Sequence, residues 1–460
     1  MSHQDSHAGS VLTNSVDLHR VLQWLISGMD WSSVRLRKDC SWSPKCLVWA
    51  ALCWAWSNEL NLVERFRCAQ RLIRHFQGCE PKAATSYQAF TKILRCWTST
   101  LVEVVQAGLR KRMLMLAKEY WRLNGYVVFG VDGSKVDLPR SRSNQRKHAC
   151  HRKGSKSQNR RRRRNQQLSA IKKAEHPSLF LTTMFHVGSQ LPWDWRIGPA
   201  DSNERAHALE MLSQLPSGSL LTADAGFAGY DFAKSVLRHD VELLIRIGAN
   251  VRLLKKLGCV RESQGTVYVW PDKAARKKSP PLIFRLVVIQ ARHPVYLLTS
   301  VTSPRDLTDQ QVAEMYQQRW RVEVFFRHFK QTFGRRKLRS HAADNAVVEL
   351  HWSMVGLWAV GIYSVTVLQS RKIPPTKLSI AKALAMFRMF ARDYLHPRKR
   401  TRTLKRLILT AIKDSYQRRS KTSRGYPSKK RERPPGTPKI KIASPTQRAL
   451  AARIKRSNKG

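Results

Sequence analysis

The sequence predicts an α/β fold between two helical regions, and three observations support this prediction. Two apolar runs, YVVFGVDGS and SLLTADAGF, have the length of buried strands, and in each an aspartate is followed within two residues by glycine. Residues 250–303 contain further short runs rich in β-branched and aromatic residues. The chain before residue 120 and the chain after residue 340 instead place apolar residues at three- and four-residue steps, which is typical of helices.

The first 120 residues are predicted to form a helical N-terminal region. The segments VDLHRVLQWLISGMD and CLVWAALCWAWSNEL favour helices with a break between them. A tryptophan cluster, Trp49, Trp54 and Trp56, is expected to belong to a core rather than to a base-stacking surface. No helix-turn-helix pattern identifies which helix would enter a DNA groove.

Asp132 and Asp224 close the two apolar runs, and both are expected at the C-terminal ends of buried strands. A carboxylate at such a position is costly unless it binds something, because desolvation disfavours the charge. Residues 138–175, which follow the first aspartate, form a basic loop whose composition predicts disorder in the free protein. The loop either follows DNA phosphates or is a solvated insertion with non-specific affinity for DNA, and the sequence leaves both open. The arginines at its centre are Arg160, Arg161, Arg162, Arg163 and Arg164.

Strand and helix patterns alternate from residue 179 onward. LFLTTMFHV and WDWRIG suit strands, NERAHALEMLSQL suits a helix, and VELLIRIG suits a strand beyond the second aspartate. Residues 250–303 then form a β-rich insertion with TVYVW, LIFRLVVI and PVYLLTSV as its runs. Trp270, at the end of the first of these runs, is either an exposed base-stacking residue or an ordinary core residue.

A helix is predicted across residues 316–330, YQQRWRVEVFFRHFK. Its polar residues Tyr316, Arg319, Glu323 and Lys330 fall within an arc of roughly 60°, beside an apolar stripe. A single glutamate among cations is ordinarily a solvated face with local ion pairs. The two strand aspartates support a second interpretation, in which this glutamate joins them at one site.

Three separated motifs resemble those of the DDE transposases with a YREK signature, the insertion-sequence-four group. They are VDGS with Asp132, ADAGF with Asp224, and the tyrosine, arginine, glutamate and lysine of residues 316–330. The likeness covers residues 120–340 and extends to phrases such as LPWDWRIGP and RWRVEVFFRHFKQT. The resemblance implies a ribonuclease-H-like catalytic domain over residues 121–340, interrupted by the β insertion 250–303.

The resemblance also implies an activity, which is cleavage of DNA at the ends of a mobile element and strand transfer into target DNA. By the same resemblance the helical N-terminal region, residues 1–120, would help to bind the DNA ends of the element, and a homodimer would bridge the two ends. Asp132, Asp224 and Glu323 would bind two Mg²⁺ ions, with Mn²⁺ as a substitute, because hard divalent cations take oxygen ligands. The residues expected to contact DNA phosphates are Tyr316, Arg319 and Lys330.

The composition independently indicates a polyanionic partner. The chain has 84 basic and 31 acidic residues and a net charge of +53, far more than solubility needs. Its eight cysteines show no zinc-type spacing, so free thiols in a reducing cytoplasm are expected. The N-terminus carries no secretory signal, and the uncharged run 352–370 is expected to be a buried core helix rather than a membrane span. We therefore expect a cytoplasmic, nucleoid-associated protein.

The end of the chain is predicted to comprise a helical C-terminal region, residues 341–396, and a basic flexible tail, residues 397–460. Within the tail, LKRLILTAIKDSY is expected to form a short helix, whereas prolines in GYPSKKRERPPGTPKIK are too dense for helix or sheet.

Three alternative functions stay open at this point. A metal-dependent nuclease of the same fold would share the three acidic residues but would not join DNA ends. A catalytically inactive DNA-binding derivative would keep the basic surface, although the intact acidic residues argue against it. A non-enzymatic basic protein would explain the charge but not the two aspartates on buried strands.

Overall fold

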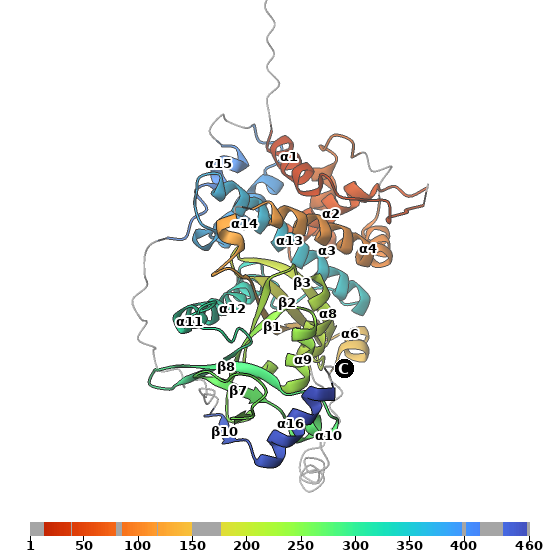
Figure 1. The fold of residues 1–460 in the computed structure, drawn as a ribbon. Coiled ribbons are helices and arrows are strands. Elements are labelled where there is room, and N and C mark those ends of the chain that lie inside the picture. Colours follow the sequence, from red (N-terminus) through yellow and green to blue (C-terminus); the bar gives the residue numbers. More distant parts are fainter. Residues whose placement is uncertain are drawn as a thin grey trace, which may run out of the picture.

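The computed structural model describes residues 13–37, 39–79, 85–116, 118–149, 176–397, 402–414 and 436–457. A ten-stranded sheet runs through it in the order β10-β6-β7-β8-β9-β5-β4-β1-β2-β3, with helices gathered beyond the β3 side (Figure 1). The arginines of residues 160–164 lie outside the described residues. The strands are β1 (Val127–Asp137), β2 (Ser178–His186), β3 (Leu191–Pro199), β4 (Ser219–Ala223), β5 (Glu242–Ile247), β6 (Arg252–Lys255), β7 (Thr266–Val269), β8 (Leu282–Ile289), β9 (Val295–Thr299) and β10 (Lys439–Ile442).

The strands β1 to β5 form the part of the sheet that carries the predicted aspartates. β1, β2 and β3 pair antiparallel, whereas β4 pairs parallel with both β1 and β5. β1 continues past Asp132 to Asp137, because β2 pairs with it along this whole length. The expectation that Asp132 ends its strand is therefore wrong. Its pairing with β4, however, stops at Gly130, so Asp132 lies just beyond the part of β1 that is enclosed on both sides.

The β-rich insertion extends the sheet rather than forming a separate layer. β9 pairs antiparallel with β5, and β8, β7 and β6 follow outward from it. β10, from the C-terminal segment, then pairs parallel with β6. The helix α16 (Pro445–Ser457) follows β10, and its Ala451 and Ile454 belong to a buried cluster with Tyr268 and Trp270 of the insertion. The prediction of a flexible tail is thus wrong for residues 436–457, since this segment gains its order from contacts with a distant part of the chain.

Helices from the two ends of the sequence pack together at one end of the molecule (Figure 1). The central one is α13 (Ala343–Gln369), which is long and apolar enough to cross a membrane. However, 89% of its most apolar 18-residue stretch is buried inside the protein. This agrees with the interpretation of residues 352–370 as a core helix. Trp49, Trp54 and Trp56 are likewise buried, which confirms the prediction that they belong to a core. The neighbouring helices are α1 (Asn14–Ile26), α2 (Pro44–Trp56), α3 (Leu62–Ile73), α4 (Tyr87–Leu114), α14 (Ile380–Arg392) and α15 (Leu404–Ile408).

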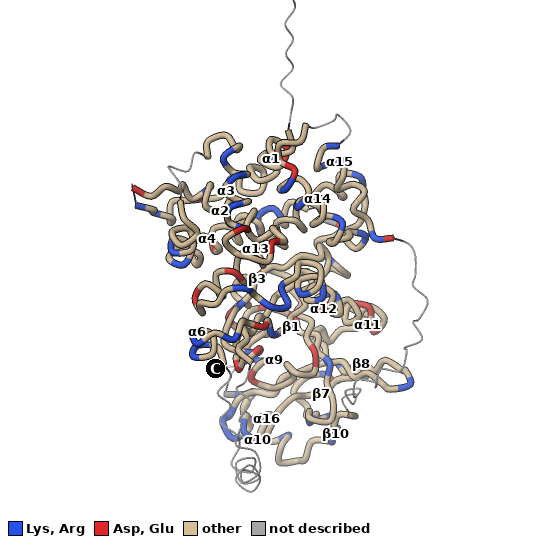
Figure 2. The backbone as a smooth tube through the Cα atoms, turned by 180° about the vertical axis from the view of Figure 1, so that it is seen from behind, with Lys and Arg blue, Asp and Glu red and all other residues tan. Residues whose placement is uncertain are grey.

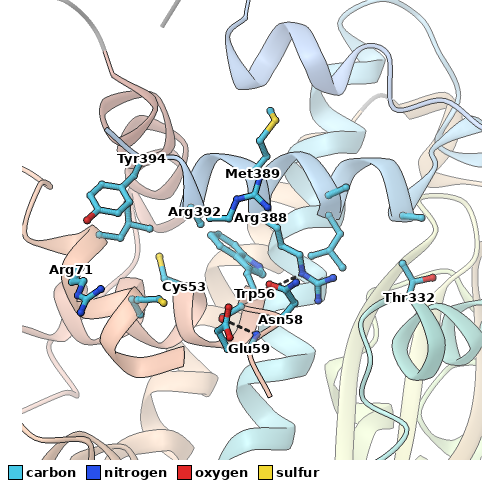
Figure 3. Close-up of a pocket in the computed structure, with 18 residues that line it drawn as sticks. Cys53, Trp56, Asn58, Glu59, Arg71, Thr332, Arg388, Met389, Arg392 and Tyr394 are labelled. Carbon is cyan, nitrogen blue, oxygen red and sulfur yellow. Dashed lines mark hydrogen bonds between the residues drawn. The ribbon is translucent and has the colours of Figure 1, made fainter. Parts of the chain in front are cut away.

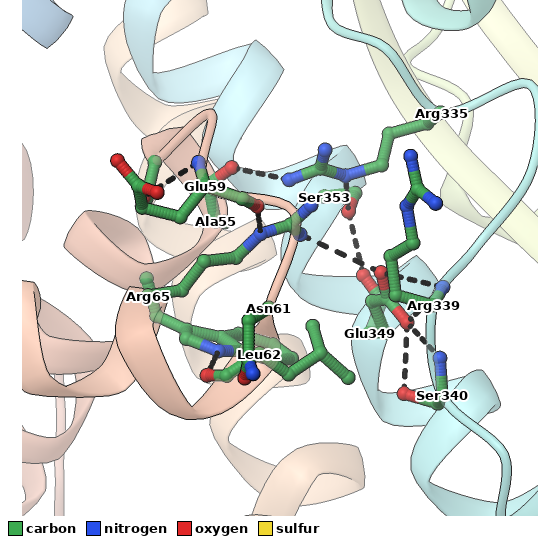
Figure 4. Close-up of polar contacts among 12 residues, drawn as sticks. Ala55, Glu59, Asn61, Leu62, Arg65, Arg335, Arg339, Ser340, Glu349 and Ser353 are labelled. Carbon is green, nitrogen blue, oxygen red and sulfur yellow. Dashed lines mark hydrogen bonds and ion pairs between the residues drawn. The ribbon is translucent and has the colours of Figure 1, made fainter.

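The segment that leads into α13 is tied to the N-terminal helices by a buried arginine (Figure 4). The Arg335 side chain donates hydrogen bonds to the carbonyl of Ala55 on α2 at 2.6 Å and to the hydroxyl of Ser353 on α13 at 2.8 Å. Burial lowers the pKa of Arg335 to about 9. The N-terminal and C-terminal helical regions therefore share one core and one polar network.

One pair of cysteines departs from the sequence-based expectation. Cys46, at the start of α2, and Cys79 are joined as a disulfide with their Cα atoms 5.7 Å apart. The expectation of free thiols is wrong for this pair, because residues separated by 33 positions meet only in the folded helical region. Among the described cysteines, the free ones are Cys40, Cys53, Cys68, Cys96 and Cys259.

Basic residues are distributed along the described chain. Figure 2 shows Lys and Arg on the helical end of the molecule as well as around the sheet and α16. This agrees with the large positive charge of the sequence.

Candidate active site

Asp132 and Asp224 lie at the same level of two adjacent parallel strands. Gly130 of β1 pairs with Thr222 of β4, and each aspartate is two residues further along the chain, Asp132 within β1 and Asp224 directly after the end of β4. The Asp132 carboxylate accepts a hydrogen bond from the N–H of Gly133 at 3.0 Å. Asp224 caps a short 3₁₀ turn and accepts from the N–H of Gly226 at 2.8 Å. The prediction that the two aspartates share one edge site is consistent with this register.

Glu323 reaches the same place from α12 (Trp320–Arg327), which packs directly over β1. A Cβ atom at Gly130 would lie 3.8 Å from both the carbonyl of Arg319 and the Cβ of Val322, which are ordinary van der Waals distances, so the start of α12 lies directly over this part of β1. The pKa of Asp132 is raised to about 6, mainly by burial and in smaller part by the charges of Glu323 and Asp224, while Arg319 opposes the rise. The structure thus brings the three predicted acidic residues together.

Two cationic side chains and one phenol lie beside this carboxylate cluster. The Arg319 guanidinium donates to a Glu323 oxygen at 2.8 Å and lies 5.7 Å from the centre of the Tyr316 ring. Burial raises the pKa of Tyr316, because the ionised phenolate is disfavoured there. Burial also lowers the pKa of Lys330, while the charges of Asp137 and Asp132 oppose that change. Because both aspartates belong to β1, the Lys330 ammonium lies near this strand.

The predicted continuous helix is interrupted at two places. α11 (Asp309–Gln318) ends before Arg319, whose N–H bonds the carbonyl of Tyr316 in a tighter turn, and α12 then begins at Trp320. Residues His328–Thr332 form a π-helical turn that contains Lys330. An ideal helical wheel therefore misplaces the lysine relative to the glutamate, because a π turn holds more residues than an α turn.

The donor atoms of this site suit a hard divalent cation. Carboxylate oxygens are the ligands that Mg²⁺ and Mn²⁺ take in proteins, and the raised pKa of Asp132 reflects a carboxylate with too little compensating charge. No group of three or more His, Cys, Asp or Glu within the described residues is close enough to hold one metal ion in this conformation. The Glu323 carboxylate is instead held by Arg319.

Sequence reasoning missed a fourth carboxylate, Glu204, in the first turn of α8 (Glu204–Met211). The pKa of Glu204 is raised to about 7, mainly by burial and in smaller part by the charges of Asp132 and Asp224. An acidic residue in the first turn of a helix is common, since it complements the helix dipole. Nothing in the local sequence therefore distinguishes Glu204 from an ordinary helix start.

Trp270 does not lie at this site. Its side chain is 4% exposed, and its indole N–H donates to the carbonyl of Ser279 at 2.8 Å. The expectation of an exposed base-stacking tryptophan is wrong, because α16 and the insertion enclose this residue in their shared cluster.

A separate cavity of about 420 Å³ lies between α2, α3 and α14 (Figure 3). Trp56, Arg388 and Tyr394 are among the residues that line it, and none of the carboxylates of the candidate site does so. The cavity therefore belongs to the helical end of the molecule and not to the proposed chemistry.

The sequence of the chain resembles those of known transposases. Residues 123–358 match the model of the family described as the transposase DDE domain. The transposase InsG of insertion sequence element IS4 from Escherichia coli strain K12 is 26% identical over 203 residues, which are 42% of this chain. These residues span only 44% of the length of that relative. A piggyBac transposase synaptic complex with hairpin DNA aligns with 90% of this chain and 88% of that chain, at 13% identity and a TM-score of 0.39.

Proposed function

The chain belongs to the transposase DDE domain family, and from this premise we propose that it catalyses metal-dependent cleavage and strand transfer of DNA during the transposition of an insertion sequence. The observation that supports the proposal most is the convergence of Asp132, Asp224 and Glu323 from two strands and a helix. The order β3-β2-β1-β4-β5, with β4 and β5 parallel to β1, supports a ribonuclease-H-like catalytic domain. The match to the IS4 transposase favours the insertion-sequence-four group.

The three carboxylates would hold two Mg²⁺ ions, with Mn²⁺ as a substitute. When bound, such ions activate an attacking water or 3′-hydroxyl and stabilise the leaving oxygen of an in-line displacement at phosphorus. Asp132 and Asp224 offer oxygens from fixed backbone positions, whereas Glu323 is carried by a helix. The protein's task is therefore to position charge rather than to supply a nucleophile.

The cations beside the carboxylates suit the phosphate of the substrate. Arg319 offers a planar donor group that can bind phosphate oxygens in pairs, and Lys330 adds a point charge. Tyr316 remains protonated, because burial raises its pKa, and its hydroxyl can donate a hydrogen bond. We propose that these three side chains orient the scissile or the flanking phosphate.

The partners of the proposed reaction are the ends of the element and a target DNA. The net charge of +53 supports strong, salt-dependent DNA binding in the nucleoid. A homodimer would bring the two ends together. The run Arg160–Arg164 would add non-specific phosphate contacts.

The test is Mg²⁺-dependent cleavage and joining of a DNA fragment that carries the gene's own flanking sequences. We expect the wild type to cut at the repeat boundary and to join the ends, and Glu323→Gln to do neither. Glu314→Gln is the matched control, since Glu314 lies on α11 and its carboxylate accepts a hydrogen bond from the Gln310 side chain of the same helix. Cutting without joining would favour a nuclease, and DNA binding without chemistry in the wild type would favour an inactive derivative.

A further inference from the structure

We propose that Glu204 is a fourth carboxylate of the metal site and that it binds the divalent cation together with Asp132. This inference rests on the proposed function. It adds to that function a residue that lies outside the three acidic motifs.

The first support is the space above Gly133, the residue that follows Asp132. A Cβ atom at this position would lie 2.5 Å from a Glu204 carboxylate oxygen and 2.6 Å from the Phe180 ring, and real Cβ atoms essentially never approach other atoms so closely. Glycine therefore allows the Glu204 carboxylate to lie against the β1 backbone immediately beside Asp132. Any larger residue at 133 would displace the carboxylate.

The second support is the way in which α8 is fixed to both aspartate-bearing segments. Arg205, the next residue, donates from its side chain to the carbonyl of Gly226 at 2.6 and 2.8 Å and to the carbonyl of Ala228 at 3.1 Å. These carbonyls belong to the turn that follows Asp224. Consecutive residues of α8 thus contact the backbone next to Asp132 and the backbone next to Asp224, so the first turn of the helix is held at the site.

The third support is that Glu204 forms no ion pair within the described residues. None of the ion pairs formed within the described residues includes it, and the neighbouring Arg205 is directed to backbone carbonyls. By contrast, the buried Asp194 pairs with Arg110 and Arg196. A partly buried carboxylate beside two others has an unfavourable environment unless a cation compensates the charge. A divalent ion at the site would supply that compensation.

The experiment measures Mn²⁺ binding to the full chain by the loss of the electron paramagnetic resonance signal of free Mn²⁺. We expect Glu204→Gln to weaken binding by about tenfold or more, as removal of metal-site partners typically does. Glutamine keeps an oxygen that can accept from the Gly133 N–H, so a purely structural role would leave Mn²⁺ affinity unchanged. Glu210→Gln is the matched control, because Glu210 lies on the same helix with its side chain 57% exposed.

The same titration separates this inference from the proposed function. Asp132→Asn should abolish Mn²⁺ binding if the proposed metal site is real. If Asp132→Asn weakens binding while Glu204→Gln binds Mn²⁺ like the wild type, the inference about Glu204 is overturned and the proposed site stands. If neither substitution changes Mn²⁺ binding, the proposed metal site itself is refuted, and the inference with it.

Thermal unfolding provides a second readout that detects a folding defect. Without divalent ions, Glu204→Gln should melt at or above the wild-type temperature, because it removes one charge from a group of carboxylates. The rise in melting temperature on adding Mn²⁺ should be smaller in the variant. A variant that melts well below the wild type without metal and still gains the full Mn²⁺ shift would show that Glu204 is structural.

Discussion

Glu349 of α13 is a buried anion at the contact between the N-terminal helices and the segment that leads into α13 (Figure 4). It is 1% exposed and accepts hydrogen bonds from the N–H groups of Arg339 and Ser340 and from the Ser340 hydroxyl. Its other oxygen lies 3.6 Å from the guanidinium of Arg65 on α3, which is 4% exposed. In Glu349→Gln the amide oxygen can still serve Arg339 and Ser340, but Arg65 loses its anion.

The expected cost follows from the geometry of this pair. Opposite charges 3.6 Å apart attract each other by about 4–5 kcal/mol at an effective dielectric constant of about 20. Removing one partner of a buried pair typically costs about 3–5 kcal/mol, since the remaining charge is left uncompensated. The nearby Arg335 adds a second buried guanidinium, so we expect the loss in the free energy of unfolding to lie within that range.

The assay is urea unfolding followed by tryptophan fluorescence and circular dichroism. Glu64→Gln is the matched control, because the Glu64–Arg67 pair is exposed and should contribute less than about 1 kcal/mol. Adding Arg65→Met to Glu349→Gln should restore part of the lost stability by removing the unpaired charge. A double variant no more stable than Glu349→Gln would refute the reasoning, and so would a loss in Glu349→Gln no greater than in the control.

Three further predictions concern the candidate site and the DNA contacts. Because burial raises the pKa of Asp132 to about 6, the folded state binds this proton more tightly than the unfolded state does. Without divalent ions, the wild type should therefore lose stability as the pH rises from 4 toward 7. In melting scans over this range, Asp132→Asn should lose less stability than the wild type. Deletion of Arg160–Arg164 should lower the salt slope of DNA binding by up to about 4 without abolishing cleavage at low salt, and an unchanged slope would remove the run from the DNA interface. Trp270→Phe leaves the carbonyl of Ser279 without its hydrogen-bond donor, so it should lower the free energy of unfolding by about 1–2 kcal/mol and leave DNA cleavage intact. A defect in cleavage without a loss of stability would instead support a base-stacking role for Trp270.

The features that the sequence predicted best are those with a strong local pattern. The two apolar runs specified buried strands, and the polar arc beside an apolar stripe specified a helix that packs on the sheet. The meeting of Asp132, Asp224 and Glu323 needed more than these patterns, since strand register and helix placement are tertiary properties. Resemblance to a known family supplied that step, and residue chemistry alone left it open.

The features that sequence reasoning missed depend on contacts between distant segments. β10 has only four residues, and β6 gives it a strand partner that no local pattern reveals. The burial of Trp270 depends on α16, which lies far along the chain. Glu204 has an ordinary place at a helix start, and no local pattern reveals that its carboxylate lies against the β1 backbone at Gly133. In each case the missing information is the identity of the neighbour.

The pairing of Arg319 with Glu323 connects the carboxylates that would bind metal with the side chains that would bind phosphate. Burial disfavours the charged form of Arg319, yet Tyr316, Glu323 and Asp132 together outweigh that effect and raise its pKa, so the guanidinium stays charged. While Arg319 donates a hydrogen bond to Glu323, this carboxylate is engaged and is not free to bind the cation of the proposed metal site. A DNA phosphate competes for the same guanidinium, and its binding would release Glu323 toward the cation. Under the proposed function, DNA and metal therefore favour each other's binding, because each takes one partner of the same ion pair.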